Sequence, residues 1–398
     1  MKTLELKNNI FWNGILDSKL RVFDIIMETQ FGTTYNSYIV KGSEKTALVE
    51  TAKEKFVDEY IESIKDVAEI SDIDYIIVNH TEPDHAGSAA KLLQLNPEIT
   101  VVGSMGAIGF LKQITNSDFK SIAVKEGDTL SLGDKTMRFF SVPNLHWPDT
   151  IYTYIEEDKV LFTCDSFGSH YSHDGILRST VENTDDYMSA TKYYFDNIIG
   201  PFKPFMKQAL KKIENLEIEM ICPGHGPVLD SHIDEIKNIY AQWCEEGKPF
   251  DKPTVVIPYV TAYGYTEMLA KKIASAIEEE GIDVLLYNMQ DEDAGRVLAD
   301  ITRAQGVLFG SPTILSEALP PILNLTSSMC PVVHGKKCAS AFGSYGWSGE
   351  AVGHIMERLV QLKMKTIDGF RIRFKPSDEE LEGAYKFGKD FANLVLGK

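Results

Sequence analysis

The stretch from His80 to His85, HTEPDH, places two imidazoles and two carboxylates within six residues. It follows the apolar run 73–78, IDYIIV, which predicts a buried strand. Side chains that directly follow a strand are held by a rigid scaffold and stay free of the sheet. In an extended segment His80, Glu82 and Asp84 would lie on the same side, whereas His85 would face elsewhere. One short turn could therefore serve two metal ions.

Three more candidate ligands follow later predicted strands. His146 lies in LHWPD (145–149), Asp165 ends the apolar run 160–164, and His225 lies in PGHG (223–226), where the glycines let the backbone approach closely. Ordinary capping residues would explain a lone histidine, but four such motifs in this order indicate a metal site. Strand alternation predicts that Cys164 and Cys222, which flank two of these motifs, point away from the site.

Two histidines follow Asp165 closely. His170 is a candidate proton donor, or a group that supports the metal ligands, and His173 is a weaker candidate for the same role. A histidine in a surface loop is an equally good explanation for His170.

The two halves of the chain have different patterns. Residues 1–249 interleave strands and helices in the manner of an αββα sandwich, with strands expected at 34–40, 45–50, 101–103, 137–142, 151–155 and 218–222 and helices at 55–64 and 186–216. Residues 253–398 alternate strands (255–260, 282–287, 306–310 and 338–342) with helices (266–280 and 294–303), which predicts a doubly wound parallel sheet. The charged, proline-containing stretch 245–253 is the expected linker. Ser377 to Glu380 predicts a capping box at the last helix.

Three loops of the second half, residues 261–266, 311–314 and 343–349, are expected to meet at the carboxyl ends of its strands, where ligands bind in such sheets. The first loop joins a strand to a helix N-terminus and supplies hydroxyls and amides for a phosphate, without a P-loop or a GxGxxG pattern. It resembles the flavodoxin phosphate loop, although Tyr263 departs from the usual [ST]-x-T-G-x-T pattern. Tyr345 and Trp347 could contact a flavin ring, or could fill core space. The predicted FMN contacts are Thr261, Ala262, Tyr263, Gly264, Tyr265, Thr266, Ser311, Pro312, Thr313, Ile314, Ser344, Tyr345, Gly346, Trp347 and Ser348.

The order of the metal-binding motifs resembles the metallo-β-lactamase superfamily, whose usual pattern is H-x-H-x-D-H. Glu82 replaces the second histidine of that pattern. Zinc hydrolases favour imidazole, whereas an additional carboxylate favours iron. We therefore expect Asp165 to bridge two irons. His80, Glu82 and His146 would complete one site, and Asp84, His85 and His225 would complete the other.

A β-lactamase-like domain followed by a flavodoxin-like domain resembles the flavodiiron proteins, also called A-type flavoproteins, over nearly the whole chain. The resemblance implies FMN, a diiron centre, and reduction of dioxygen to water or of nitric oxide to nitrous oxide in the cytoplasm. It also implies a head-to-tail homodimer or a dimer of dimers. The sequence has no C-x-x-C pair, so we expect no fused rubredoxin module and an external electron donor, either rubredoxin or reduced coenzyme F420.

Composition limits the remaining possibilities. A formal charge of −18 disfavours nucleic acid as a partner. The five scattered cysteines favour a reducing compartment. The sequence contains no run of 18 apolar residues, so we expect no membrane-spanning segment. The N-terminus lacks the apolar core of a signal peptide. Two alternatives stay open: a dizinc hydrolase with an accessory FMN domain, and an electron carrier that uses only its FMN.

Overall fold

The computed structural model describes residues 3–24 and 27–398. Its internal contacts divide the chain into two compact units, the first ending at Cys244 and the second beginning at Glu245. The limits 1–249 and 253–398 stay a prediction from the sequence. Within the described residues, no helix combines the length and the apolar character that a bilayer crossing requires.

Two sheets form the centre of the first unit. The seven-stranded sheet has the order β1-β2-β7-β8-β9-β10-β11, and the five-stranded sheet runs from β12 to β16. Val49 and Ile77 of the first sheet pack against Phe139 and Phe162 of the second, in the core between the sheets. The strands are β1 (Leu4–Lys7), β2 (Ile10–Trp12), β7 (Tyr38–Lys41), β8 (Thr46–Val49), β9 (Tyr75–Val78), β10 (Thr100–Gly103), β11 (Lys120–Ala123), β12 (Thr129–Ser131), β13 (Thr136–Ser141), β14 (Ile151–Ile155), β15 (Val160–Cys164) and β16 (Met220–Pro223). Two short pairs, β3 (Ile15–Asp17) with β6 (Thr33–Tyr35) and β4 (Val22–Phe23) with β5 (Met27–Glu28), lie outside them.

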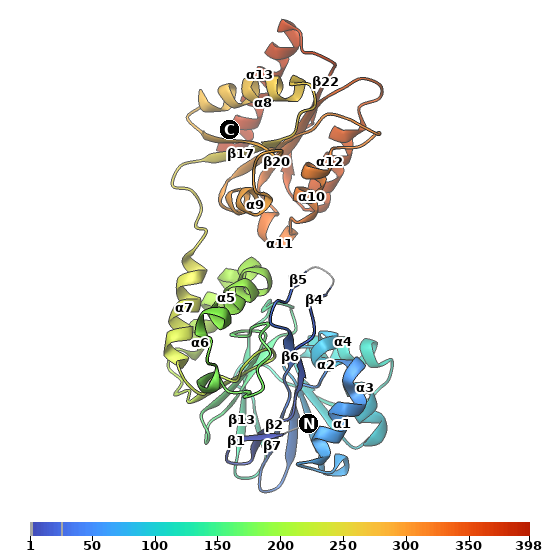
Figure 1. Ribbon diagram of the computed structural model, residues 1–398, viewed down its shortest axis with the longest axis vertical. Helices are drawn as coiled ribbons and strands as arrows, with labels where there is room; N and C mark the ends of the chain where they lie inside the picture. The colour runs from blue at the N-terminus through green and yellow to red at the C-terminus, as the bar shows by residue number, and fades with distance from the viewer. Residues whose placement is uncertain (1–2, 25–26) are drawn as a thin grey trace. The chain divides into compact units, whose positions relative to one another are not determined.

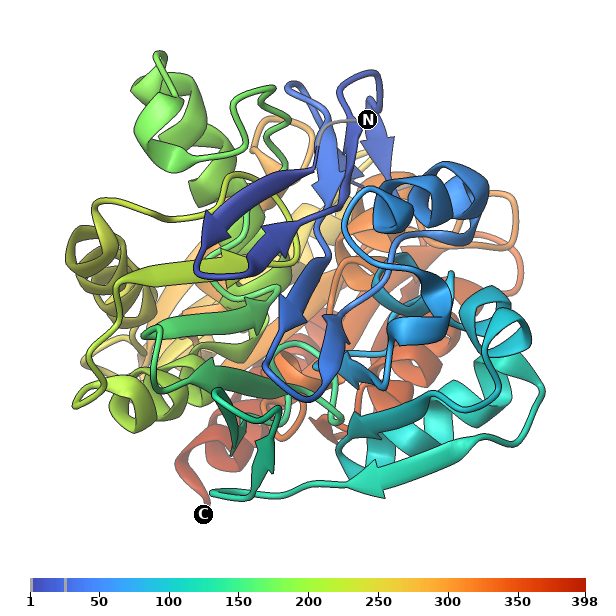
Figure 2. The same ribbon diagram turned by 90° about the horizontal axis from the view of Figure 1, so that it is seen from below.

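Helices cover the outer face of each sheet of this unit, on opposite sides of the strands (Figures 1 and 2). Alternation along β13 explains the layers, because Phe139 points into the core between the sheets and Phe140 into the core beneath the helices. The structure thus confirms the αββα sandwich. On the seven-stranded side lie α1 (Val57–Lys65), α3 (Ala89–Leu95) and α4 (Met105–Thr115); on the other side lie α5 (Thr184–Tyr194), α6 (Lys203–Ile213) and α7 (Ile233–Glu245).

Two predicted elements of this unit are interrupted. The strand expected at 34–40 breaks between β6 and β7, where the Asn36 side chain donates to the carbonyl oxygens of Pro223 and Gly226 at 2.9 and 2.8 Å. The helix expected at 186–216 is α5 and α6, separated by a π-helical turn (Phe195–Ile199) and a 3-10 turn (Gly200–Phe202). Prolines lie at the starts of the 3-10 turn and of α6, where a missing backbone donor is tolerated.

The second unit is a parallel sheet of order β18-β17-β19-β20-β21, with β22 also paired to β20. This is the order expected of a flavodoxin-like doubly wound fold, which the structure confirms. The strands are β17 (Thr254–Tyr259), β18 (Asp283–Asn288), β19 (Gly306–Gly310), β20 (Cys338–Tyr345), β21 (Lys365–Thr366) and β22 (Phe370–Arg373). One face packs on α8 (Tyr265–Glu278) and α13 (Asp378–Leu396), the other on α9 (Ala294–Arg303), α10 (Pro320–Ser327) and α12 (Glu350–Gln361). A short helix, α11 (Pro331–His334), precedes β20. The capping box of Ser377 and Glu380 is present at α13.

Candidate metal centre and flavin site

The HTEPDH stretch turns sharply after β9. Pro83 begins a short helix, α2 (Pro83–Ala86), with Glu82 as the residue before it. Proline suits this first helical position because its φ is preset for a helix. The turn carries Asp84 and His85 to a different group of side chains from His80 and Glu82. The prediction that His80, Glu82 and Asp84 lie on the same side is therefore wrong, because it assumed an extended segment.

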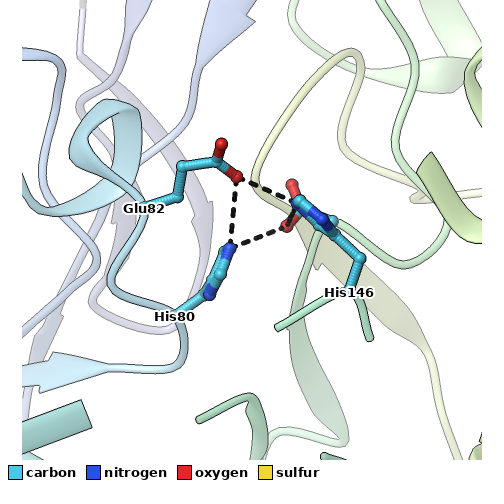
Figure 3. A group of neighbouring side chains, drawn as sticks. His80, Glu82 and His146 are labelled. Atoms are coloured by element: carbon cyan, nitrogen blue, oxygen red, sulfur yellow. Dashed lines mark hydrogen bonds and ion pairs between the residues drawn. The ribbon is translucent and has the colours of Figure 1, made fainter. Parts of the chain in front are cut away.

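The first group of candidate ligands combines His80, Glu82, His146 and Asp165. In Figure 3, His80 and Glu82 point toward one another and toward His146. Oε2 of Glu82 lies 3.3 Å from Nε2 of His80 and 2.9 Å from Nε2 of His146. Both imidazole nitrogens lie 3.6 Å from Oδ2 of Asp165.

The second group combines Asp84, His85 and His225. Oδ2 of Asp84 lies 3.1 Å from Nε2 of His225 and 3.6 Å from Nε2 of His85. The other carboxylate oxygen of Asp165, Oδ1, lies 3.1 Å from Nε2 of His85 and 3.7 Å from Nε2 of His225. Asp165 thus faces one group with each of its oxygens, as a bridging carboxylate would.

The position of Asp165 follows from an irregular end of β15. Cys164 has a left-handed φ of +48°, and the pairing of β15 with β16 shifts register between Phe162 and Cys164. This break in strand alternation turns the Cys164 thiol toward the site, 3.9 Å from Oδ2 of Asp165. The expectation that Cys164 points away is therefore wrong.

The donor atoms of both groups are spaced as metal ligands are. Nitrogen and oxygen ligands lie about 2.0–2.2 Å from a transition metal, so neighbouring donors are separated by about 3 Å. Asp84 adds a second observation: it is buried, and the side chains 3.1 and 3.6 Å from its Oδ2 are the imidazoles of His225 and His85, which are themselves candidate ligands. A buried carboxylate is costly unless a cation neutralises it. The seven residues therefore fit two bound irons.

Neighbouring histidines lower the pKa values of the Glu82 and Asp84 carboxyl groups. Burial alone would raise the pKa of Glu82, but hydrogen bonds from His146 and His80 hold that pKa at about 2. The pKa of Asp84 is also held below its usual range, against the effect of burial, by the charges of His85 and His225. Both groups are therefore ionised at neutral pH, as metal ligands must be.

Residues far apart in the chain orient these ligands, and the motifs did not identify them. Nδ1 of His80 lies 3.3 Å from Oδ1 of Asp149, whose Oδ2 accepts hydrogen bonds from the amide and hydroxyl of Thr81. Nδ1 of His225 donates to the carbonyl oxygen of Thr34 at 2.5 Å. With Nδ1 engaged in this way, each ring presents Nε2 to the cluster. The only sequence signal for Asp149 is its place in the WPD run after His146.

A cavity of about 240 Å³ opens beside the metal groups. Its apolar lining includes Phe23, Met27 and Ile198, and its polar lining includes His170. Burial lowers the pKa of His170 to about 3, so its imidazole is neutral. Nδ1 of His170 lies 2.9 Å from the Thr33 hydroxyl, and Nε2 is buried without a partner in the described parts of the chain. A catalytic role for His170 stays a prediction, and it would have to be that of a neutral ring.

His173 lies outside this cavity lining. Its Nε2 lies 2.9 Å from the hydroxyl of Thr180. This pairing accounts for His173 without a role at the metals.

The three predicted flavin loops lie at the carboxyl ends of neighbouring parallel strands, β17, β19 and β20. Gly264, the residue before α8, has a φ of +80°, and its amide donates to the Thr261 hydroxyl at 3.0 Å. The hydroxyls of Thr266, at the start of α8, and Ser344 lie 3.3 Å apart, so the first and third predicted segments meet. Ser344 and Tyr345 belong to β20 and not to a loop, because pairing with β22 extends that strand.

These loops display aromatic rings that the domain itself leaves uncovered. Tyr263 is 81% exposed and Trp347 is 93% exposed. The alternative, in which Trp347 fills core space, is wrong. Exposed rings beside a helix N-terminus suit a phosphorylated, planar ligand. The site therefore fits FMN.

The fold and the two sites define a two-domain flavoprotein with a dinuclear metal centre. Family models match both parts: "ODP family beta lactamase" over residues 33–226 and "Flavodoxin" over residues 257–388. The chain is 40% identical to the flavo-diiron protein FprA2 of Clostridium acetobutylicum, covering 99% of this chain and 100% of that one. It is 33% identical to the anaerobic nitric oxide reductase flavorubredoxin of Salmonella typhi, covering 97% of this chain and 81% of that protein.

Solved structures agree with these matches. Rubredoxin oxygen:oxidoreductase from Desulfovibrio gigas aligns with a TM-score of 0.70 and 26% identity, over 100% of this chain and 99% of that one. The Giardia intestinalis flavodiiron protein aligns with a TM-score of 0.67 and 28% identity, over 100% and 97%. The chain belongs to the flavodiiron protein family. It is an oxidoreductase whose cofactors are FMN and a diiron centre.

Proposed function

We propose that this protein reduces dioxygen to water, nitric oxide to nitrous oxide, or both, at a diiron centre in the β-lactamase-like domain. The observation that carries the proposal is the position of the Asp165 carboxylate, which directs one oxygen toward each group of candidate ligands. When bound, two irons would supply electrons and open coordination positions, and FMN would resupply the electrons. The ligands would be His80, Glu82 and His146 on one side and Asp84, His85 and His225 on the other.

The cavity beside the ligands supports a small substrate. Phe23, Met27 and Ile198 give it an apolar wall, which suits a diatomic gas. Glu82 and His146 are the partly exposed ligands of the cluster, with side chains 19% and 17% exposed. The substrate would therefore approach on the side of Glu82 and His146.

The electron donor and the assembly belong to the same proposal. The Desulfovibrio gigas relative is named for rubredoxin, and we propose rubredoxin as the external donor, with reduced F420 as the alternative. A head-to-tail homodimer would set one chain's FMN near the partner's irons. None of the five cysteines, all of which lie in the described residues, forms a disulfide, which supports a reducing cytoplasm.

Metal analysis and anaerobic kinetics test the proposal. Protein from iron-replete cells should contain about two irons and one FMN per chain. Rapid mixing of the reduced protein with dioxygen or nitric oxide, each alone, should reoxidise the flavin in at least one case. Two zincs with negligible iron would favour the dizinc hydrolase instead, and an iron-free flavoprotein would favour the simple electron carrier.

A further inference from the structure

Glu50 is a buried carboxylate directly behind the second group of ligands. It follows β8, is 2% exposed, and has a left-handed φ of +59°. A glutamate gains nothing locally from this backbone region, so the strain indicates that the fold holds the side chain there for another reason.

One oxygen of Glu50 has a clear partner. Oε1 accepts a hydrogen bond of 2.8 Å from the amide of Asn79, the residue before His80. The other oxygen, Oε2, is buried and has no partner in the described parts of the chain. An unpaired carboxylate oxygen at this depth is costly, and a donor nearby would relieve it.

His85 is the candidate donor for this unpaired oxygen of Glu50. Its Nε2 faces Asp165, whereas its Nδ1 is buried and also lacks a partner within the described residues. A ring nitrogen of His85, a carboxylate oxygen of Glu50 and Sγ of Cys164 lie within 4.8 Å of one another. Gly224 closes the space beside the ring, since a Cβ there would stand 3.0 Å from Nδ1. The backbone around both residues is fixed, because Thr51 donates its amide and hydroxyl to the carbonyl oxygen of His85.

We propose that Glu50 is the positioning residue for His85: its Oε2 accepts a hydrogen bond from Nδ1–H, which keeps the proton on Nδ1 and leaves the Nε2 lone pair for iron. This inference rests on the proposed ligand role of His85. His80 and His225 already have this arrangement, with Asp149 and the Thr34 carbonyl as acceptors. Glu50 would also link the two ends of HTEPDH, through Asn79 at one end and His85 at the other.

Glu50→Gln makes a sharp test because it keeps the size of the side chain. The amide oxygen must face the Asn79 N–H, so the NH₂ group faces Nδ1 of His85. Nδ1 would then become an acceptor and Nε2 would carry the proton, which blocks metal binding. We expect the affinity for one of the two metals to fall about 10- to 100-fold, as is typical for a lost outer partner. Equilibrium dialysis of the FMN-loaded, metal-free protein against Fe²⁺ under anaerobic conditions measures this affinity.

Four variants separate a positioning role from a structural one. His85→Ala should lose the same metal affinity as Glu50→Gln, the double variant should lose no more than either, and Glu50→Asp should recover part of it. NMR of the Zn²⁺-loaded protein, labelled with ¹⁵N-histidine, should place the His85 proton on Nδ1 in the wild type. A further loss in the double variant, or an Nε2 proton in the wild type, would overturn the role of Glu50. Full affinity in His85→Ala would instead overturn the ligand assignment of His85, and the proposal with it.

Discussion

The hydroxyl of Tyr194 donates a hydrogen bond of 2.9 Å to Oδ1 of Asp165, and both side chains are buried. Burial and the charge of Asp165 raise the pKa of Tyr194 well above its usual value of 10. The phenol therefore stays a donor at every working pH and fixes the carboxylate that lies between the two metal groups.

Replacing Tyr194 by Phe should loosen Asp165 without removing a ligand. A hydrogen bond to a charged group contributes about 1.5–3 kcal/mol, which corresponds to roughly 10- to 100-fold in metal affinity if all of it is lost. Iron content after dialysis against a chelator measures the effect. Tyr154→Phe is the control, because its hydroxyl donates to the Glu217 carbonyl away from the ligands. Equal iron loss in both variants would contradict this account.

Gly224 should tolerate no side chain. A Cβ at this position would stand 2.5 Å from Cε1 of His85, closer than real carbon contacts allow. Gly224→Ala should therefore displace the His85 ring and lower the iron content toward one per chain. Gly109→Ala, a change in α4 with no heavy atom within 4 Å, should leave iron unchanged. Full iron in Gly224→Ala would show that the ring can move without loss of metal.

Flavin affinity should depend on the exposed rings of the second unit. Replacing Trp347 or Tyr263 by alanine should weaken FMN binding about 10-fold or more, because each ring is largely exposed in the domain and could pack its face against the flavin. Fluorescence titration of the flavin-free protein measures this. Val360→Ala provides the control, since Val360 is 62% exposed on α12 of the same domain. Iron content should stay the same in all three variants.

The sequence predicted both folds and brought the seven candidate ligands together because each ligand motif directly follows a strand. Strand order then decides where these ends meet, and the alternation of buried residues is strong enough to define the strands. His146 and Asp165 follow β13 and β15, which are separated in the sheet only by β14. The flavin loops were predictable for the same reason.

The residues that orient the ligands could not be predicted from the sequence, because they act through contacts between positions far apart in the chain. Tyr194 is 29 positions from Asp165, and Thr34 is 191 from His225. Neither residue belongs to a motif, and tyrosine and threonine are common in any core. Spacing alone put Asp84 on the side of His80 and Glu82, although the expected ligand set grouped it with His85 and His225. The spacing argument failed because Pro83 begins a helical turn where alternation suggested an extended segment.

Acid should destabilise the flavodoxin-like domain through His334. Burial lowers the pKa of His334 below 6.5, and Nδ1 accepts a hydrogen bond from the Cys330 amide at 3.1 Å. The unfolded chain therefore binds this proton first, and stability falls as the pH drops from about 6.5 toward the folded pKa, by at most about 1.4 kcal/mol per pH unit. Urea unfolding at pH 7 and pH 5 should show a smaller loss for His334→Gln than for the wild type. An equal loss would mean that His334 is protonated in the fold.

Glu82→His should change which metal the protein retains. The substitution restores the H-x-H-x-D-H pattern and exchanges a carboxylate for an imidazole, and imidazole-rich sites favour zinc. Protein produced with equal iron and zinc in the medium should therefore bind more zinc and less iron than the wild type. Glu82→Asp keeps the carboxylate and serves as the control, with fewer metals in total but no shift toward zinc. If Glu82→His kept its iron-to-zinc ratio, the preference for iron would have to come from the carboxylates of Asp165 and Asp84, and Glu82 would be only one of seven candidate ligands.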